Sequence, residues 1–448
     1  MILDRSRLAR LLAAEESRFE AAHPRSRELF DRARRSLLGG VPMNWMIRSP
    51  GAFPIFVARA QASRFVDVDG HSYLDLCLGD TGAMTGHAPP ALVEAIGDQA
   101  RRGLTFMLPT EDAVFVGEEL ARRFGLPFWQ MALTATDANR FAIRLARHVT
   151  RRPRVLVFNG CYHGTVDETF ATLKDGRVAA RAGNLGPPVD PAVTTRVVEF
   201  NDVAALEDAL APCDVACVLA EPAMTNIGII HPEPGFHEAL RAITRETGTL
   251  LILDETHTIS AGPGGYTGAH GLAPDMVTIG KPIAGGVPAS AYGMTREVAE
   301  RVRATTRVEE ADTGGIGGTL AGNALSLAAM RAALERVLTS EAYAHTIPLA
   351  RRFTDGVAAS IVRYELPWCV TQLGCRAEYW FRETLPRNGS EAAAGIDPDL
   401  DRYMHLAALN RGILMTPFHN MALIGPDTTE EDVELHTRVF RESVEVLA

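Results

Sequence analysis

Lysine is rare in this chain of 448 residues: of its 45 lysine and arginine side chains, only Lys174 and Lys281 are lysines. Lys281 follows Gly280 and the apolar residues 276–279, a pattern typical of a buried strand. Burial disfavours the charged ammonium form, and a neutral amine can attack a carbonyl carbon, whereas a guanidinium group cannot. Lys281 is therefore a candidate Schiff-base lysine. The alternative is a strand-end lysine whose amine reaches the solvent, and the local sequence does not separate the two.

A carboxylate occupies the corresponding place after another apolar run. Asp254 directly follows residues 250–253 and precedes Lys281 by 27 residues, about one crossover unit. Two such strand ends can lie at one edge of a sheet. An acid for a pyridinium nitrogen and a lysine for an aldehyde are the two fixed points of a pyridoxal phosphate site. Taken alone, Asp254 is better explained as a helix N-cap or a salt-bridge partner.

A phosphate group needs backbone amides, and two segments could provide them. Thr134, Ala135 and Thr136 come just before the helical stretch 138–149. Hydroxyl and small residues at a helix N-terminus form an anion site, although simple N-capping explains them equally well. Thr319, in a Gly-Gly-Thr segment that opens another helical run, offers a second hydroxyl.

Aromatic and imidazole side chains also follow the strands. Tyr162 and His163 come shortly after the apolar run 155–158, and Tyr162 could stack on a flat ring, although an ordinary half-buried tyrosine is more common. His257 could carry protons, but a structural role is expected more often. Lys174 lies in a polar segment and is expected to be solvated.

The elements that must position these residues follow from the apolar runs. Residues 155–158, 215–220 and 250–253 are continuously apolar, as in strands buried on both faces of a parallel sheet. Helical patterns at 138–149 and 236–247 separate them, which indicates an α/β fold with crossover helices. Ligands of such sheets bind at the carboxyl ends of the strands, where the candidate residues lie.

The chain ends differ from this central part. We expect a large domain at 75–330 and a small α+β domain built from both ends, 1–74 and 331–448. Residues 51–75 should form an antiparallel unit with a tight turn at 67–70. The stretch 165–192 is rich in Gly, Pro and Ala with weak periodicity, and is expected to be a long loop of the kind that often forms a lid.

Composition excludes several classes of function. The chain is 46% hydrophobic and 22% charged with a net charge of −10, so it lacks the basic surface that nucleic acid requires. No apolar run is long enough to span a membrane, and the N-terminal residues lack the order of a signal peptide. The six cysteines form no CxxC pair. We therefore expect neither a disulfide framework nor a metal, and a cytoplasmic location.

In their order along the chain, these segments resemble the class III aminotransferases of fold type I, in the branch around glutamate-1-semialdehyde aminomutase and its transaminase relatives. The resemblance covers residues 35–440. Each motif is weak by itself, and the combination is specific. The matching segments are residues 67–70, 86–89, 161–164, 221–228, 254–255, 280–286 and 318–323.

This resemblance implies roles for individual residues. Lys281 would bind the cofactor aldehyde and carry protons, Asp254 would hold the ring nitrogen, and Asn226 would meet the phenolic oxygen. Thr319 would reach the phosphate of the neighbouring subunit, which implies a homodimer with shared active sites. The implied cofactor-binding set is Lys281, Asp254, Thr134, Ala135, Thr136, Tyr162, His163, Glu221, Asn226, Thr256, His257 and Thr319.

Four segments depart from the family pattern: residues 134–138, Thr256 in place of an apolar residue, and two that bear on the substrate. Where relatives that act on amino acids carry an arginine for the carboxylate, this chain has Trp45 and Met46. Arg48 is near, but on an extended chain it would point the other way. Residues 418–420 lack the acidic residue expected of the aminomutase. Both departures favour a pocket, lined by Trp45, Met46 and Tyr162, that tolerates apolar groups.

The expected function is a pyridoxal-phosphate-dependent aminotransferase. It would move an amino group from a primary amine, or from a β- or ω-amino acid, to a keto acid such as pyruvate in a ping-pong reaction, with Arg376 or Arg382 as candidates for the acceptor carboxylate. The alternatives are a 2,1-aminomutase, in which donor and acceptor are one molecule, and another pyridoxal phosphate reaction such as racemisation or decarboxylation. A non-catalytic interaction module is the last alternative, and the presence of Lys281 in so lysine-poor a chain argues against it.

Overall fold

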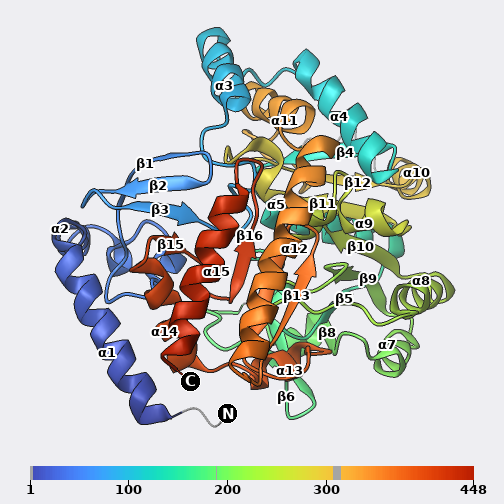
Figure 1. Cartoon of the computed structure of the whole chain (residues 1–448). Coiled ribbons are helices and arrows are strands. Elements are labelled where there is room, and N and C mark those ends of the chain that lie inside the picture. The colour runs from blue at the N-terminus through green and yellow to red at the C-terminus, as the bar shows by residue number, and fades with distance from the viewer. Residues whose placement is uncertain (1–3, 188, 306–313, 448) are drawn as a thin grey trace. The chain divides into compact units, whose positions relative to one another are not determined.

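The computed structural model describes residues 4–187, 189–305 and 314–447 (Figure 1). The chain divides into two compact units. Unit 1 comprises Met1–Pro89, Glu341–Leu385 and Gly395–Ala448, and unit 2 comprises Pro90–Ser340 and Pro386–Ala394. The division thus falls after residues 89 and 340, whereas the sequence analysis placed it after residues 74 and 330.

Unit 2 is built around a seven-stranded sheet in the order β4-β12-β11-β10-β9-β5-β8. Strand β10 pairs in parallel with β9 and β11, β5 pairs in parallel with β9 and β8, and β12 runs antiparallel to both β11 and β4. The mostly parallel sheet expected from the sequence is confirmed. Every residue of β9, β10 and β11 is buried, which is why these segments are continuously apolar. The strands are β4 (Phe128–Ala132), β5 (Arg154–Phe158), β8 (Thr195–Val198), β9 (Val215–Ala220), β10 (Leu250–Asp254), β11 (Met276–Ile279) and β12 (Ser290–Met294).

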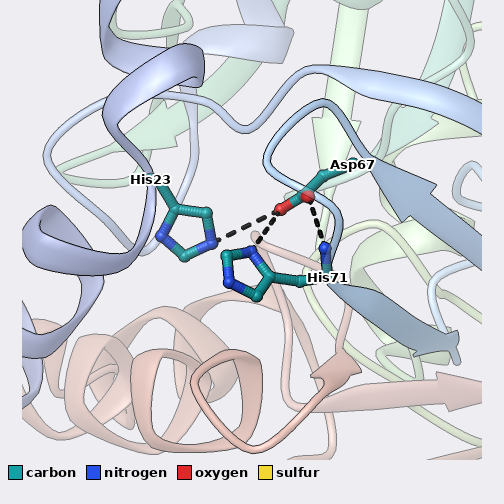
Figure 2. Close-up of side chains that lie close together, drawn as sticks. All are labelled: His23, Asp67 and His71. Carbon is teal, nitrogen blue, oxygen red and sulfur yellow. Dashed lines mark hydrogen bonds and ion pairs between the residues drawn. The ribbon is translucent and has the colours of Figure 1, made fainter.

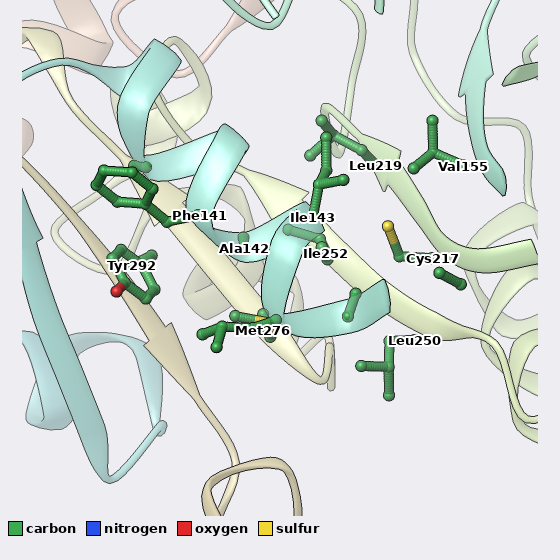
Figure 3. Close-up of a cluster of buried hydrophobic side chains, with 14 of the residues drawn as sticks. Phe141, Ala142, Ile143, Val155, Cys217, Leu219, Leu250, Ile252, Met276 and Tyr292 are labelled. Carbon is green, nitrogen blue, oxygen red and sulfur yellow. The ribbon is translucent and has the colours of Figure 1, made fainter. Parts of the chain in front are cut away.

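Helix α5 (Ala135–Thr150) packs against this sheet and forms its main core (Figure 3). Phe141 and Ile143 of α5 lie in one buried cluster with Ile252, Met276 and Tyr292 of the strands. Each fully buried side chain of this size stabilises the fold by roughly 1.5–3 kcal/mol. The other helices of unit 2 include α3 (Pro90–Arg102), α4 (Glu111–Phe124), α7 (Val203–Leu210), α8 (Phe236–Glu246), α9 (Gly265–His270), α10 (Arg296–Thr305), α11 (Ala324–Arg336) and α13 (Gly389–Ala394).

The stretch 165–192 is more ordered than the expected long loop. It contains the short helix η3 (Asp167–Thr169) and a hairpin of β6 (Ala171–Lys174) and β7 (Arg177–Ala180), and the short helix α6 (Pro191–Thr194) begins at its end. Asp175 and Gly176 have φ values of 51° and 71°, the positive values that a two-residue hairpin turn needs. Periodicity failed to reveal the hairpin because neither strand has one cleanly buried face. Lys174 is exposed, as expected.

Unit 1 joins the two ends of the chain in one sheet. Strands β1 (Val57–Gln61), β2 (Arg64–Asp67) and β3 (Ser72–Asp75) pair antiparallel, and β15 (Ile413–Leu414) pairs in parallel with β3. The expected antiparallel unit, and a small α+β domain built from both ends, are thereby confirmed. Gly70 lies in the β2–β3 turn with a φ of 94°, a value that glycine adopts most readily.

A second sheet of unit 1 has the order β13-β14-β16 and is antiparallel throughout. In the described part of the chain, no helix combines the length and the hydropathy needed to cross a bilayer. The remaining elements of unit 1 include β13 (Cys369–Leu373), β14 (Arg376–Trp380), β16 (Met421–Leu423), α1 (Arg5–Ala22), α2 (Pro24–Ala33), η1 (Leu38–Gly40), η2 (Asn44–Ile47), α12 (Ser340–Arg363), α14 (Pro398–Leu409) and α15 (Glu430–Glu445).

Candidate active site

Lys281 comes two residues after β11, at the start of the short helix η5 (Lys281–Ala284). Its φ of 50° is left-handed, which costs a non-glycine residue about 1–3 kcal/mol and is found most often at functional sites. A Cβ on Gly280 would lie only 3.0 Å from the Cβ of Ala135, so the loop passes close to the N-terminus of α5. The half-buried Lys281 directs its Nζ to within 2.5 Å of Nε2 of His257.

Asp254 ends β10 on the neighbouring strand. Its register partner on β11 is Thr278, three residues before Lys281, and the amide of Glu255 donates to the carbonyl oxygen of Thr278 at 2.8 Å. Parallel pairing therefore brings the two strand ends that carry Asp254 and Lys281 side by side. The 27-residue spacing in the sequence corresponds to this single crossover.

The carboxylate of Asp254 is buried and surrounded by hydrogen-bond donors. Its Oδ2 accepts from Nδ2 of Asn139 at 2.8 Å and from Nδ1 of His163 at 2.9 Å, and its Oδ1 accepts from the amide of Thr256 at 3.0 Å. Burial alone would raise the pKa of Asp254, but the hydrogen bonds with His163, Thr256 and Asn139 lower it to about 2. Asp254 is therefore a carboxylate that can stabilise a protonated ring nitrogen.

His163 completes a buried ion pair with Asp254. Burial alone would lower the pKa of His163, but Cys161 and Asp254 beside it raise the pKa above its ordinary value. Tyr162, the preceding residue, is half-buried and meets the ring of Phe170 edge-on at 6.1 Å. Stacking of Tyr162 on a cofactor ring stays a prediction.

The first turn of α5 is capped by its own side chains. Thr134 is the N-cap, and its Oγ1 accepts from the amide of Asp137 at 3.2 Å. The Oγ1 of Thr136 accepts from the amide of Thr165 at 3.0 Å. Gly164 makes this contact possible, because a Cβ there would lie 2.1 Å from the same oxygen. The hydroxyls of Thr134 and Thr136 thus shape the turn, while the first amides of a helix have no partner inside it and can hold a phosphate.

Several buried polar atoms near these residues lack a hydrogen-bond partner among the described residues: Nε2 of His163, Oε1 of Glu221 and Oγ1 of Thr256. Burial raises the pKa of Glu221 to about 7, although His163 and a hydrogen bond from Thr225 oppose the rise. Unpaired buried polar atoms are rare in native proteins and indicate a bound group or water. Asn226 is half-buried and donates to the carbonyl oxygen of Gly160 at 3.0 Å.

These features fit pyridoxal phosphate. The buried carboxylate of Asp254 suits a protonated ring nitrogen, and Nζ of Lys281 suits an aldehyde carbon. The N-terminus of α5 beside the Lys281 loop suits a phosphate. Thr319 is exposed in the single chain, as a residue that serves a second subunit would be.

Two residues that the sequence analysis missed organise this site. Asn139 of α5 and Thr278 of β11 are both 0% exposed, and Oγ1 of Thr278 donates to Oδ1 of Asn139 at 2.6 Å. An amide on the otherwise apolar stripe of α5 was a usable signal, because a buried polar residue is more informative than a buried apolar one. Thr278 gave no such signal, since threonine is common in strands.

The substrate candidates Trp45, Met46 and Arg376 all lie in unit 1. Trp45 and Met46 belong to the 3-10 helix η2 (Asn44–Ile47), where the sequence analysis assumed an extended chain. Residues three apart share a face of a 3-10 helix. Trp45 meets the ring of Phe418 edge-on at 6.1 Å, and the guanidinium of Arg48 lies 5.6 Å from the same ring. The extended chain on which the expectation for Arg48 rested is absent, and its direction relative to Trp45 stays a prediction.

Arg376 is fully buried at the start of β14. Its guanidinium donates to the hydroxyl of Thr81 and lies 2.7 Å from Sδ of Met421. Thr81 itself has a φ of 83°, a left-handed value that a β-branched residue seldom adopts. Binding of a carboxylate by Arg376 stays a prediction.

A separate cluster of titratable side chains in unit 1 contains His23, Asp67 and His71 (Figure 2). Their two ring nitrogens and one carboxylate oxygen lie within 4.8 Å of one another, and such atoms can bind a transition metal. Hydrogen bonds already engage these side chains. Nδ1 of His71 donates to Oδ2 of Asp67 at 3.1 Å, Nδ1 of His23 donates to the carbonyl oxygen of Phe19 at 2.6 Å, and the hydroxyl of Tyr73 donates to Asp67 at 3.0 Å. The cluster acts as a hydrogen-bonded link between the end of α1 and the β2–β3 turn, and the absence of a metal stays a prediction.

The fold and the lysine–aspartate pair define a pyridoxal-phosphate enzyme of fold type I. Residues 46–434 match the family Aminotransferase class-III. The chain is 36% identical over 432 residues to a glutamate-1-semialdehyde 2,1-aminomutase of Sorangium cellulosum, with 94% of this chain and 96% of the relative covered. It is 34% identical over 420 residues to the enzyme of the same name from Desulfitobacterium hafniense strain DSM 10664 / DCB-2, with 92% and 95% covered.

Solved structures agree with this assignment. A crystal structure of a glutamate-1-semialdehyde-aminomutase from Pseudomonas aeruginosa PAO1 superposes with a TM-score of 0.97 at 51% identity over 100% of both chains. An omega-transaminase from Sphaerobacter thermophilus superposes with a TM-score of 0.85 at 28% identity, covering 94% of this chain and 98% of that one. The chain belongs to the class III aminotransferases, and its cofactor is pyridoxal phosphate.

Proposed function

We propose that this chain is an aminomutase that converts glutamate 1-semialdehyde into its isomer 5-amino-4-oxopentanoate. The amino group moves from carbon 2 to carbon 1 and the carbonyl group from carbon 1 to carbon 2, so no second substrate is consumed. The observation that carries the proposal is the 51% identity to the Pseudomonas aeruginosa aminomutase over the whole of both chains. The relatives at 32–36% identity support the same reaction. They favour it over the amine transaminase that the sequence analysis expected.

Lys281 carries the reacting amine, and His257 is its proton partner. Nζ of Lys281 and Nε2 of His257 are close enough to share a hydrogen bond. His257 can take the proton that Nζ of Lys281 must lose before the amine attacks a carbonyl carbon. Lys281 would then remove and return protons at the two reacting carbons of the substrate as base and acid.

Asp254 provides a negative charge for the cofactor ring. When bound, pyridoxal phosphate supplies an aldehyde for the substrate amine and a ring that accepts electrons. The buried carboxylate of Asp254, held ionised by three donors, keeps a proton on the ring nitrogen. Thr319 of one subunit would contact the phosphate bound to the other, and the active form would then be a homodimer.

A second candidate function is a transaminase for a primary amine or a β- or ω-amino acid. It is favoured by the aromatic pair of Trp45 and Phe418, by the exposed side chain of Met46, and by the lack of an acidic residue at 418–420. The solved omega-transaminase at 28% identity is consistent with it. This reaction differs from the aminomutase in requiring a separate donor and acceptor.

The test is turnover of the purified protein with glutamate 1-semialdehyde as the sole substrate. Formation of 5-amino-4-oxopentanoate, absent in Lys281→Ala, supports the aminomutase. In a parallel sample, the visible absorbance is followed after addition of a primary amine alone and then of pyruvate. Bleaching by the amine and recovery with pyruvate, without isomerisation of the semialdehyde, would replace the aminomutase by the transaminase.

A further inference from the structure

The side-chain amide of Asn139 has one possible orientation. One end of this amide faces Oδ2 of Asp254 at 2.8 Å and the carbonyl oxygen of His163 at 3.1 Å. A carboxylate and a peptide carbonyl can only accept, so this end must be the NH2 group with its two protons. The other end is then Oδ1, and the hydroxyl of Thr278, 2.6 Å away, must donate to it.

Strand register explains why Asp254 and Thr278 share this amide. They are paired residues on the adjacent parallel strands β10 and β11, so their side chains leave the same face of the sheet. Helix α5 covers that face and presents Asn139 between them (Figure 3 shows the same helix over these strands). Asn139 thereby links α5, β10, β11 and the segment after β5.

The arrangement determines the charge of Asp254. Asn139 and the amide of Thr256 are obligate donors, and each contacts a different oxygen of the carboxyl group. Both donors bond more strongly to a carboxylate than to a carboxylic acid, so both favour the ionised form of Asp254.

We propose that Asn139 and Thr278 are positioning residues for the cofactor: Thr278 orients the amide of Asn139, and Asn139 keeps Asp254 ionised and directed at the ring nitrogen. This inference rests on the pyridoxal phosphate site of the proposed function. It extends that site by two residues that touch neither the substrate nor the cofactor. Their effect reaches the cofactor through the carboxylate of Asp254.

The test compares two probes that differ at a single atom. Pyridoxamine phosphate has a ring nitrogen and forms no covalent bond with Lys281; its 1-deaza analogue carries C–H in place of that nitrogen. Binding of each to the full-length protein is measured by titration calorimetry. The variants are Asn139→Asp, which keeps the shape but puts an acceptor in place of the donor, and Thr278→Val, which removes the hydroxyl, with Thr278→Ser as the matched control.

We expect Asn139→Asp to weaken pyridoxamine phosphate binding by about 10- to 100-fold and Thr278→Val by about 2- to 10-fold. Thr278→Ser should bind like the native chain, and the deaza analogue should lose much less affinity in every variant. Such non-additivity identifies an effect transmitted to the ring nitrogen. Thermal melting of the unliganded variants shows whether each is folded. If Asn139→Asp does not fold, the comparison of the two probes is made with Thr278→Val.

Equal losses for the two probes would overturn the inference, because a purely structural role affects both ligands alike. If Thr278→Ser bound pyridoxamine phosphate as weakly as Thr278→Val, the role of the hydroxyl would be overturned. If the native chain bound neither probe, the cofactor site itself would be wrong, and the inference would fall together with the proposed function. If pyridoxamine phosphate behaved as expected but glutamate 1-semialdehyde were not isomerised, the proposed reaction would fail and the positioning role would stand.

Discussion

Lys281 lies next to the imidazole of His257, with Nζ and Nε2 2.5 Å apart. An imidazole at this distance can take a proton from the amine and return it. In the proposed function, reactivity of the amine would therefore depend on His257, a residue for which the sequence alone favoured a structural role. The contact arises because the loops after β10 and β11 leave the sheet at neighbouring positions.

Replacing His257 by glutamine should slow attachment of the cofactor to Lys281 by about 10²-fold at pH 7, because glutamine cannot accept a proton. The rate is measured by mixing cofactor-free protein with pyridoxal phosphate and following the visible absorbance. The difference from the native chain should shrink toward pH 10, where hydroxide removes the proton instead. Slowing by the same factor at every pH would contradict a role in proton transfer. Pyridoxamine phosphate, which forms no bond with Lys281, should bind both proteins alike.

Glu221 should make the cofactor-free protein less stable as the pH rises. Its pKa is raised from 4.5 to about 7, mainly because burial disfavours the charge. The folded chain therefore holds this proton more tightly than the unfolded chain. The resulting stabilisation is complete below pH 4.5 and is lost as the pH rises through about 7, a difference of roughly 3 kcal/mol at most.

Substitution of Glu221 by glutamine removes this titration. The melting temperature of Glu221→Gln, relative to the native chain, should be higher at pH 8 than at pH 5. The exposed Glu207 on α7 provides the control, since Glu207→Gln should change melting by the same amount at both pH values. A Glu221→Gln difference that does not vary with pH would show that the buried carboxyl group is not the source.

At the scale of elements, α5 connects the parts of the site. Its first turn contacts the loop after β5 through Thr136 and the Lys281 loop through Ala135, and its buried face carries Asn139. A shift of this helix would therefore disturb the phosphate end and the ring-nitrogen end of the cofactor site together. The closest approach is at Gly164, where an added Cβ would lie 2.1 Å from Oγ1 of Thr136.

Gly164→Ala should separate the loop after β5 from α5. The new Cβ would lie 2.1 Å from Oγ1 and 2.8 Å from Cα of Thr136, at a φ of 77°. Gly176 provides a matched control, because its φ is 71° and its added Cβ would meet no atom within 4 Å. Gly176→Ala should lower the free energy of unfolding only by the conformational cost of about 1–2 kcal/mol. Gly164→Ala should lower the free energy of unfolding by more than this. It should also weaken pyridoxamine phosphate binding by about 10-fold, as expected for one lost hydrogen bond. Equal behaviour of the two variants in denaturant unfolding and calorimetry would refute the role of this contact.

At the scale of the whole molecule, unit 2 has a surface that suits a second copy of the chain. Leu104, Phe106, Met107 and Leu108 are 44–78% exposed, and Leu320 beside Thr319 is 49% exposed. The amide of Leu325 donates to the carbonyl oxygen of Leu104 at 3.2 Å, so the two apolar segments are neighbours. Contiguous exposed apolar side chains commonly mark an interface. This supports the proposed dimer, with Thr319 at its contact surface.

Mixing two inactive variants tests whether the sites are shared. Lys281→Ala and Thr319→Val are each assayed at limiting pyridoxal phosphate, then unfolded together and refolded. If Thr319 serves the partner's site, a mixed dimer contains one site with both native residues, and about a quarter of native activity should return. Recovery no greater than the mean of the two separate variants would mean that Thr319 acts within its own subunit. Refolded native protein provides the reference activity.

Local patterns in the sequence predicted much of this protein. Continuous apolar runs revealed β5, β9 and β10, because strands buried on both faces need apolar residues at every position. The scarcity of lysine drew attention to Lys281, and the strand ends to Asp254. These properties depend on residue type and short spacing, so the sequence by itself determined the fold class and pointed to the cofactor, and the order of its motifs carried the resemblance to the family.

Other features depended on residues far apart in the chain. The hydrogen bonds among Asn139, Asp254 and Thr278 require the register of β10 and β11 and the packing of α5 above them. The 3-10 turn that brings Trp45 and Arg48 to one aromatic ring, and the hairpin at 171–180, have no strong local pattern. Only the tertiary structure decided them, because hydrogen-bond partners and shared faces are set by the register and packing of elements, which residue type and periodicity do not specify.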